Sequence, residues 1–588
     1  MATRFLTLTP YKKALEILQK SAELPYKCEH VQVTKSLGNI TYQPVYAKLT
    51  VPQTAISQRD GYAVSSAATE HARDSQPVVL SDYVFVHTGS PIPQGYDAVI
   101  MQEDVRIEPD QILILKPARS GQNIQKTGKE TSSGKMIVPG NHLISTTDIG
   151  AMVSYGVTTV AIKKFIVALI PAGNELKEHG NTPKPGEVIE SNTRMLQAYL
   201  EKLNIIPVLH QIIPDSSEQV KTAVQQAVLD SSFVIISGGT STGKRDFTRS
   251  VLSEIGTILY HGIAIRPGRT TLAARVNNVI VFGLPGSPVG STSVFEEVIL
   301  PWLFECGFPV PPNHTIQAML AESIPSDIGT DDFIPVVVGA VNETYKAVMA
   351  PRGNGQMTNV RANGILHIAH NLEGLKQGDR CNIRLTRPYP DLNNVFLILG
   401  ASDLIIDILD QFLRRKRMRL YCRPARTDAV LLSMQNRGIH GGIISRFHMN
   451  DNFCDIDYSL LLEPSSAMHI ADKIYIMASR EGKNSRDEQI TVQYDASIIS
   501  EDEIIDKIRK GEIGAGPCSE YLAAEYSLSG PVIGHESIDL IIRNEDLENE
   551  QIKHLQSLLS SEAWRREVDL VIGYSAEKSG DISPLSPK

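Results

Sequence analysis

The stretch Phe233-Val234-Ile235-Ile236-Ser237-Gly238-Gly239-Thr240-Ser241-Thr242-Gly243 decides the fold of the region around it. A run of Val and Ile this apolar is typical of a strand buried on both faces of a parallel sheet. Glycines directly after such a strand let the backbone approach a ligand, and a helix expected from about Arg245 offers unpaired N–H groups to an anion. The stretch therefore predicts a phosphate or oxyanion site at a strand end.

A P-loop is one alternative interpretation of these glycines, because its pattern is G-x-x-x-x-G-K-[ST]. Gly238, Gly243 and Lys244 fit the pattern, but Arg245 stands where a hydroxyl would bind the magnesium of a nucleotide. Asp246 follows one residue later. A plain turn between a strand and a helix is a further alternative, so the neighbouring segments must decide between them.

Strands and helices alternate on both sides of this loop. Residues 165–170, 205–209 and 279–282 have the composition of buried strands, and the apolar residues from 220 to 228 follow helical spacing. Ser216 precedes that helix as a candidate cap. This alternation predicts a doubly wound α/β domain.

The whole chain, 588 residues long, is expected to be a multidomain α/β and β protein. Short β-like runs with Gly and Pro dominate both the N-terminal part and the segment after the α/β domain. The last unit alternates strand and helix again, so we expect a separate domain whose removal leaves the rest soluble and active. The predicted parts are a β-rich N-terminal region (1–160), the α/β domain (161–308), a small β-barrel-like domain (309–390), a C-terminal α/β domain (395–578) and a disordered Ser/Pro-rich tail (579–588).

Composition narrows the class of protein. The net charge of -9 argues against a general nucleic-acid binder, which would carry a basic field. The six cysteines are scattered without a C-x-x-C pair, which suits reduced thiols rather than a disulfide scaffold or a zinc site. No stretch approaches the length of a membrane span, and the first residues lack a long apolar segment. We therefore expect a cytoplasmic protein that binds neither nucleic acid nor membrane.

Acids, glycines and tight turns follow the predicted strands of the α/β domain, where ligands bind in open α/β sheets. Glu175 follows the first strand, Asp215 follows the second, and Asp246 comes after the glycine loop. Two arginines flank a turn nearby, and the fixed fork of arginine suits anions with several oxygens. The acids suggest a divalent cation such as Mg²⁺. The full set of candidate binding residues in this domain is Gly238, Gly239, Thr240, Ser241, Thr242, Gly243, Arg266, Pro267, Gly268, Arg269, Pro285, Gly286 and Ser287.

Structural roles compete with these assignments. An isolated acid is most often a helix cap or a turn residue, and Asp215 is the most open to that interpretation because Ser216 follows it. Arg266 and Arg269 could be solvated surface charges.

Five linked motifs resemble the molybdopterin molybdotransferases of the MoeA and gephyrin E-domain type. They are Asp60-Gly61-Tyr62-Ala63-Val64, Thr88-Gly89-Ser90-Pro91 with residues 97–103, Ser237 to Gly243 with Asp246-Phe247-Thr248, residues 265–269, and residues 283–289. The resemblance covers residues 5–388.

The resemblance implies that molybdate, or tungstate, is joined to the dithiolene of adenylated molybdopterin with release of AMP. It implies that Asp60, Glu175, Asp215 and Asp246 are the functional acids, with Glu175, Asp215 and Asp246 as ligands of Mg²⁺, and that Thr88 contacts substrate. It also implies an elongated homodimer in which the N-terminal part of one subunit completes the site of the other.

The sequence departs from the family pattern around the expected oxyanion site. Arg266 to Thr270 replaces Lys-Pro-Gly-Lys-Pro, and Gly286 to Gly290 replaces Gly-Asn-Pro-Val-Ser, with Ser291 one place late. Two expected arginines are Gln125 and Pro335. A protein that binds oxyanion or pterin as a sensor or store, without turnover, is therefore the alternative function. A P-loop-like nucleotidase is the third hypothesis, and Arg245 argues against it.

Residues 397–588 resemble a periplasmic-binding-protein-like domain, through residues 400–409, 440–443 and 537–542. The Asn-Arg and Gly-Ser-Gly-Thr-Arg segment of that family is missing. The resemblance implies a small ligand on this domain without naming it.

Overall fold

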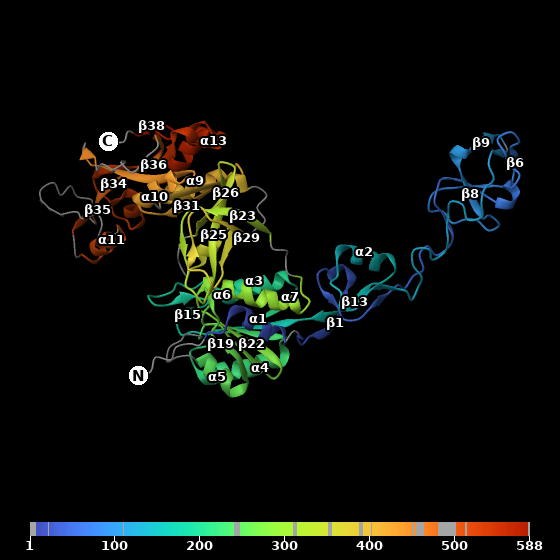
Figure 1. The fold of residues 1–588 in the computed structure, drawn as a ribbon, viewed down its shortest axis with the longest axis horizontal. Coiled ribbons are helices and arrows are strands. Elements are labelled where there is room, and N and C mark those ends of the chain that lie inside the picture. Colours follow the sequence, from blue (N-terminus) through green and yellow to red (C-terminus); the bar gives the residue numbers. More distant parts are fainter. Residues whose placement is uncertain are drawn as a thin grey trace.

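The computed structural model describes residues 8–20, 23–109, 111–239, 247–309, 314–350, 355–386, 392–400, 403–449, 452–453, 464–479, 501–511 and 514–585. Figure 1 shows an elongated molecule in which an N-terminal arm extends from a central α/β domain. A β-barrel lies on that domain, and a C-terminal α/β domain lies on the barrel. Across the described ranges, no helix is long and apolar enough to cross a membrane.

The arm has a proximal and a distal part. The proximal part is built on an antiparallel sheet of β1 (Lys27–Gln32), β13 (Thr159–Lys164) and β2 (Ile40–Thr41), with α2 (Thr146–Ser154) beside it. In the distal lobe, β5 (Gly61–Val64) pairs with both β7 (Val84–Val86) and β8 (Ala98–Met101). The remaining strands of the arm are β3 (Val45–Tyr46), β4 (Ile56–Ser57), β6 (Val78–Leu80), β9 (Val105–Glu108), β10 (Gln111–Ile114), β11 (Ile124–Gln125) and β12 (Met136–Val138).

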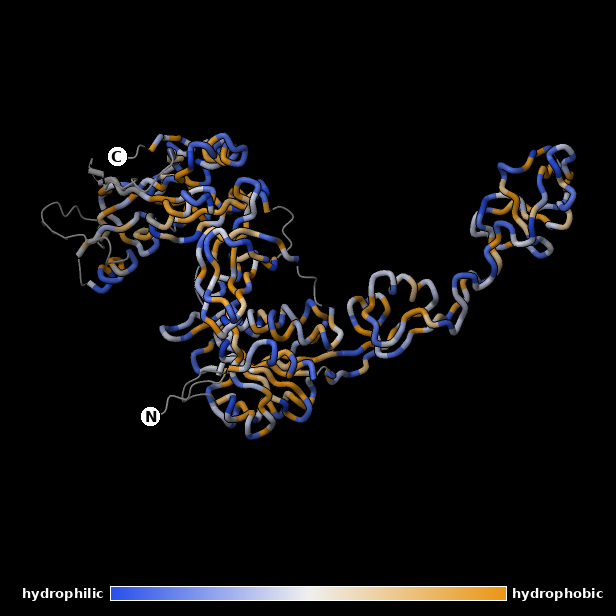
Figure 2. Tube along the Cα trace, in the orientation of Figure 1, coloured by the Kyte–Doolittle hydropathy of each residue, from blue (hydrophilic) through white to orange (hydrophobic). Residues whose placement is uncertain are grey.

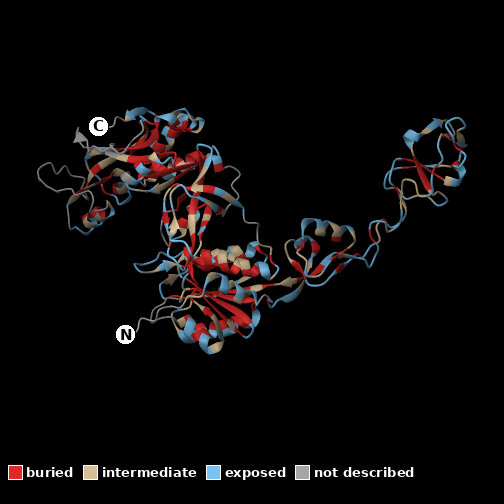
Figure 3. Cartoon of the chain, in the orientation of Figure 1, coloured by how far each residue is buried: buried red, intermediate tan, exposed pale blue. Residues whose placement is uncertain are grey.

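The central domain confirms the predicted doubly wound α/β fold. Helices cover both faces of its sheet: α1 (Tyr11–Gln19), α3 (Asn192–Lys202), α6 (Pro288–Val294) and α7 (Leu300–Glu305) pack on one face, and α4 (Ser217–Asp230) and α5 (Phe247–Ile255) pack on the other. Figures 2 and 3 show the sheet as a hydrophobic and buried layer. The strand order is β17 (Ile206–Leu209), β14 (Ile166–Pro171), β18 (Phe233–Ser237), β22 (Val279–Leu284), β21 (Leu272–Val276) and β19 (Thr257–His261).

The β-rich segment that follows closes into a barrel. Its strands run in the order β25 (Asp331–Val341), β26 (Thr344–Met349), β23 (Thr315–Leu320), β29 (Arg380–Leu385) and β27 (Gly364–Ile368), and β27 pairs back onto β25. A short strand of the α/β domain, β20 (Ile265–Arg266), adds to β25 in parallel. The smaller elements are β15 (Leu176–Lys177) and β16 (Val188–Ile189) of the α/β domain, and β24 (Ile324–Pro325), α8 (Gln356–Arg361) and β28 (Gly374–Leu375) of the barrel domain.

The C-terminal domain is built on one mixed sheet. Its parallel part is β31 (Arg419–Pro424), β30 (Val395–Gly400) and β32 (Gly441–Met449), and the long strands β36 (Val532–Arg543) and β34 (Ser465–Ser479) follow in antiparallel pairing. The other elements are α9 (Leu404–Arg414), α10 (Thr427–Gln435), β33 (Asn452–Phe453), α11 (Glu501–Lys510), β35 (Ala515–Ser519), α12 (Glu520–Glu525), α13 (Glu550–Leu559), α14 (Glu562–Asp569) and β37 (Tyr574–Ser575).

The tail differs from the prediction that it is disordered from residue 579. β38 (Ile582–Leu585) pairs antiparallel with β34, from Met468 opposite Ile582 to Ser465 opposite Leu585. Ser579 is buried, and its hydroxyl accepts a hydrogen bond of 3.2 Å from the indole N–H of Trp564. A Ser/Pro-rich composition suggested disorder, but a free strand edge and a buried indole partner order the segment up to Leu585.

Candidate active site

The carboxyl ends of β14, β18 and β22, with the segment after β17, form one connected edge of the sheet. Beyond the strands, Ala172 N donates to Ser237 O at 2.9 Å, and Gly238 N donates to Leu284 O at 3.2 Å. Gly173 N donates to the carbonyl oxygen of Ile213 at 3.0 Å, which places the segment before Asp215 beside the segment before Glu175. The segments that carry Glu175, Asp215, Gly238 and Pro285 are therefore brought together.

Gly238 and Gly239 turn the chain at this edge with positive φ angles of 95° and 69°. A Cβ on Gly238 would lie 2.2 Å from the carbonyl oxygen of Ala172, and one on Gly239 would lie 2.7 Å from the hydroxyl of Thr248. Both positions thus require glycine for conformation and for space. The rest of the predicted loop, Thr240 to Gly243, and Asp246 lie outside the described residues.

Glu175 and Asp215 lie on adjoining segments of the edge. The Glu175 side chain is folded over Gly173, since its Oε1 would lie 2.8 Å from a Cβ placed there. Asp215 N donates to the Asn174 side-chain oxygen at 3.1 Å. The Ser216 hydroxyl caps α4 by accepting from Gln219 N, so Asp215 is not the cap. Within the described residues there is no group of three or more His, Cys, Asp or Glu that could hold a metal ion.

Asn192, the first residue of α3, also belongs to this edge. It is 7% exposed, and its side-chain nitrogen donates to Ser237 Oγ at 3.1 Å and to Gly286 O at 2.8 Å. The buried side-chain oxygen of Asn192 has no hydrogen-bond partner among the described residues. An unsatisfied buried acceptor at a strand-end edge is a candidate ligand contact. Its position after β16 gave no signal, because Asn is common at helix starts.

The turn after β22 is held mainly by its own hydrogen bonds. Ser287 caps α6 by accepting from Gly290 N at 3.3 Å, while Gly286 is exposed at the edge. Ser291 is fully buried and donates to the carbonyl oxygen of Pro285 at 2.7 Å. The serine that the sequence places one position late therefore fixes the shape of the turn.

Arg266 points to the barrel. Its guanidinium donates to Asp327 at 2.5 Å and to the fully buried Asp332, which also accepts from the Ser326 hydroxyl at 2.8 Å. Arg266 lines a cavity of about 400 Å³ between the α/β domain and the barrel, together with Pro267, Val289, Asp327, Asp332 and Pro335. The guanidinium fork is thus engaged by carboxylates in this structure.

The other members of the Arg266 turn have clear structural positions. Gly268 has a φ of 127°, and a Cβ there would lie 2.7 Å from Val294. The Arg269 carbonyl oxygen accepts from Ile263 N at 3.1 Å, and its side chain is exposed.

Asp60 and Thr88 lie together, but in the distal lobe of the arm. Thr88 N donates to Asp60 Oδ1 at 2.7 Å, and that backbone hydrogen bond lowers the pKa of the Asp60 carboxyl. Figure 1 places this lobe at the far end of the arm, away from the strand-end edge of the α/β domain. One chain therefore does not bring Asp60 and Thr88 to Glu175 and Asp215.

Two family models match consecutive parts of the chain. Residues 9–156 match the "MoeA N-terminal region (domain I and II)", and residues 168–305 match the MoCF_biosynth family, the "Probable molybdopterin binding domain". The chain carries MoeA N-terminal and MoCF_biosynth domains. Most of the arm lies within the first match, and Glu175, Asp215 and Gly238 lie within the second.

Named relatives agree with these matches. The chain is 28% identical over 294 residues to the molybdopterin molybdenumtransferase of Haemophilus influenzae, across 47% of this chain and 72% of the relative. It is 28% identical over 313 residues to that of Staphylococcus aureus, across 50% of this chain and 74% of the relative. A solved structure of a molybdopterin biosynthesis MoeA protein from Pyrococcus horikoshii is similar with a TM-score of 0.56 and 28% identity, across 65% of this chain and 100% of that protein.

Proposed function

We propose that the protein is a molybdenum insertase of molybdenum cofactor biosynthesis. It joins molybdate, or tungstate, to the dithiolene of adenylated molybdopterin and releases AMP. The single observation that carries this proposal is the edge where Glu175, Asp215, Gly238 and Gly239 converge inside the MoCF_biosynth match. The relatives named as molybdenumtransferases support the reaction class.

The residues of this edge have distinct roles in the proposal. The turn at Pro285–Gly286–Ser287 leaves backbone groups open to an adenylate phosphate, because a Cβ on Gly286 would meet nothing within 4 Å. The buried Asn192 oxygen accepts a hydrogen bond from the pterin or ribose. Arg269, which is exposed beside the turn, supplies positive charge for the oxyanion.

Oxygen donors suit Mg²⁺, and Glu175 and Asp215 supply carboxylates on adjoining segments. In the proposal these two residues, with Asp246, hold the ion. When bound, Mg²⁺ would stabilise the negative charge that develops as the phosphoanhydride is cleaved.

The same proposal makes the protein a homodimer. Asp60 and Thr88 are fixed to each other but lie far from the edge of their own chain. A second copy whose distal lobe reaches this edge would supply them. The described cysteines are free thiols, which supports a cytoplasmic location.

For the C-terminal domain we propose a binding-protein-like role. Its parallel β31-β30-β32 unit is followed by the long antiparallel strands β36 and β34, which support such a fold. A second candidate function for the whole chain is an oxyanion or pterin sensor without turnover. The engagement of Arg266 by Asp327 and Asp332 favours it, because this fork is then not open to an oxyanion.

The test is AMP release from adenylated molybdopterin with molybdate, with tungstate, and with neither. Oxyanion-dependent release is expected. Glu175→Gln or Asp215→Asn should lower it by about 100-fold or more, because a metal ion supplies several kcal/mol of transition-state stabilisation and about 1.4 kcal/mol is tenfold in rate. The matched control is Asp230→Asn, an exposed carboxylate paired with Lys27 at the end of α4, which should keep full release. If the wild-type protein binds the pterin tightly but releases no AMP, the insertase proposal fails and the sensor function takes its place.

A further inference from the structure

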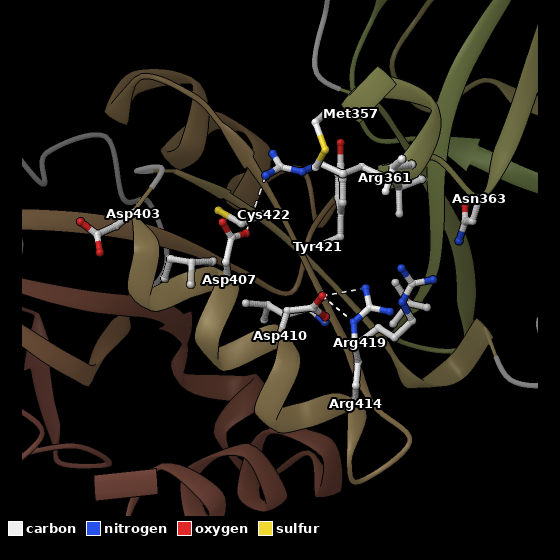
Figure 4. Close-up of a pocket in the computed structure, with 15 residues that line it drawn as sticks. Met357, Arg361, Asn363, Asp403, Asp407, Asp410, Arg414, Arg419, Tyr421 and Cys422 are labelled. Carbon is white, nitrogen blue, oxygen red and sulfur yellow. Dashed lines mark hydrogen bonds and ion pairs between the residues drawn. The ribbon is translucent and has the colours of Figure 1, made fainter. Parts of the chain in front are cut away.

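A second cavity, of about 220 Å³, lies between the barrel and the C-terminal domain. Figure 4 shows its walls: α8 of the barrel domain on one side, and α9 and β31 of the C-terminal domain on the other. Val337, Val395, Ile406 and Leu420 supply an apolar lining. The proposed reaction assigns no role to this cavity. Its lining residues also lie outside both family matches, the second of which ends at residue 305.

Two of the three carboxylates that line the cavity are fully engaged. Asp410 accepts from Arg414 Nε at 2.8 Å and from Leu420 N at 2.8 Å. Asp403 caps α9, accepts from the Tyr574 hydroxyl at 2.7 Å, and lies 3.3 Å from Lys473 Nζ. These groups therefore form part of the wall and are not open to a ligand.

Tyr421 and Arg361 are in a different situation. Tyr421 is 6% exposed and lines the cavity, and its buried hydroxyl has no hydrogen-bond partner among the described residues. In Figure 4 its ring rises from β31 toward Arg361 and Met357. Burial raises the pKa of Tyr421, whereas the charges of Arg423 and Arg361 act in the opposite direction. The hydroxyl is therefore a neutral donor beside a cation.

The contact between Arg361 and Asp407 is loose. The two side chains approach to 3.7 Å, which is beyond hydrogen-bond length, and Asp407 is 71% exposed. Arg361 thus keeps donors for another partner. A buried hydroxyl costs free energy unless it is hydrogen-bonded. The cavity therefore offers this donor to an acceptor that none of the described residues provides.

We propose that this junction cavity binds a small organic monocarboxylate, whose carboxylate accepts from the Tyr421 hydroxyl and from Arg361 while its apolar part lies against Val337, Ile406 and Leu420. A ligand with a single negative charge fits, because Arg361 supplies one positive charge and Asp407 lies beside it. A doubly charged phosphate would be repelled by that carboxylate. The proposal is independent of the reaction at the strand-end edge.

The experiment uses the full chain and two probes of equal shape, benzoate and its neutral isostere benzamide. Binding is followed by saturation-transfer NMR and by the shift in Tm. Benzoate at about 10 mM should bind and raise the Tm, and benzamide should bind at least tenfold more weakly, the factor that about 1.4 kcal/mol represents. Equal binding of the two probes, or no benzoate binding, overturns the proposal. Displacement of benzoate by inorganic phosphate would also overturn it.

Two matched Tyr→Phe variants separate binding from structure. Tyr421→Phe removes a hydroxyl that has no hydrogen-bond partner among the described residues, so it should leave the Tm unchanged or higher. It should weaken benzoate about tenfold, as expected for a hydrogen bond to a charged group. Tyr574→Phe removes a hydroxyl that donates to Asp403, so it should lower the Tm and leave benzoate affinity unchanged. Arg361→Gln should weaken benzoate at least as much as Tyr421→Phe. Unchanged affinity in both Tyr421→Phe and Arg361→Gln contradicts the assigned contacts.

Discussion

The two ends of strand β25 make opposite kinds of contact with neighbouring domains. At its start, Asp332 accepts from Arg266 of the α/β domain. Within the barrel, Asp331 lies 2.8 Å from His367 Nε2 and 3.3 Å from His370 Nδ1. Toward its end, Val337 and Val341 share one apolar core with β30, β31 and α10 of the C-terminal domain. The ionic end beside the candidate active site depends on charge, whereas the apolar end holds the barrel and the C-terminal domain together.

Removal of the C-terminal domain should have the largest effect on the apolar end of β25. A chain that ends at Thr386 exposes Val337, Val341 and Val348, which are buried in the shared core. At about 1.5 to 3 kcal/mol per apolar side chain, the barrel should lose about 5 kcal/mol or more. We expect aggregation in gel filtration and a clear fall in Tm, which revises the sequence-based expectation of a dispensable C-terminal domain. A monodisperse truncated protein with the Tm of the corresponding full-length transition would contradict the shared core.

Gly339→Ala tests the same end with a single methyl group. A Cβ on Gly339 would lie 2.6 Å from the carbonyl oxygen of Val395, and backbone cannot move aside easily. Such overpacking should cost about 3 kcal/mol in the free energy of unfolding, measured with urea. Gly514→Ala is the matched control, because a Cβ there meets nothing within 4 Å. If both variants unfold at the same urea concentration, the two domains are not in close contact at Gly339.

His440 should make the apolar end sensitive to acid. It is buried, its Nδ1 accepts from Leu397 N at 3.0 Å, and burial lowers its pKa to about 4. The unfolded chain binds the proton first, near the ordinary pKa of about 6.5, so stability is present above that pH and is lost as the pH falls toward 4. The loss between pH 8 and pH 5 should be about 2 kcal/mol.

The control for this pH dependence is His440→Gln. This variant should be less stable at pH 8 but should lose most of the extra slope between pH 6.5 and 5 in urea unfolding. If the free energy of unfolding falls with pH equally steeply in the wild type and in the variant, another group causes the acid sensitivity.

The sequence predicted the α/β domain and its edge because both follow local rules. Buried strands are short runs of Val and Ile. Gly238 follows its strand directly, and Glu175 and Asp215 lie in the segments after theirs. The long-range contacts had no such signal. The acids that engage Arg266 come about sixty residues later in the chain, and the backbone that faces Gly339 belongs to another domain.

Three further features could not be predicted from the sequence, because they too depend on long-range contacts. The buried Asn192 oxygen and the Tyr421 hydroxyl lack partners within the described part of the chain, and this becomes visible only when the surrounding side chains are placed. The Ser/Pro-rich composition from Ser579 predicted a disordered tail, yet Ile582–Leu585 supplies a strand to β34 because an edge was open there.

The smallest effects are expected at the ionic end, where one arginine has a buried and an exposed partner. Arg266 is 48% exposed, Asp332 is 1% exposed, and Asp327 is 72% exposed. Asp332→Asn should lower the free energy of unfolding by about 1 to 2 kcal/mol, because the Asp332 carboxylate is removed from water. The loss is no larger because water still screens the half-exposed Arg266. Asp327→Asn should change stability by less than about 0.5 kcal/mol, as surface ion pairs do.

Raising the salt from 0.05 to 1 M should remove the Asp327 effect and leave most of the Asp332 effect, since screening acts on exposed pairs. Urea unfolding of both variants at the two salt concentrations measures this difference, and equal losses for the two would show that Asp332 is no better shielded than Asp327.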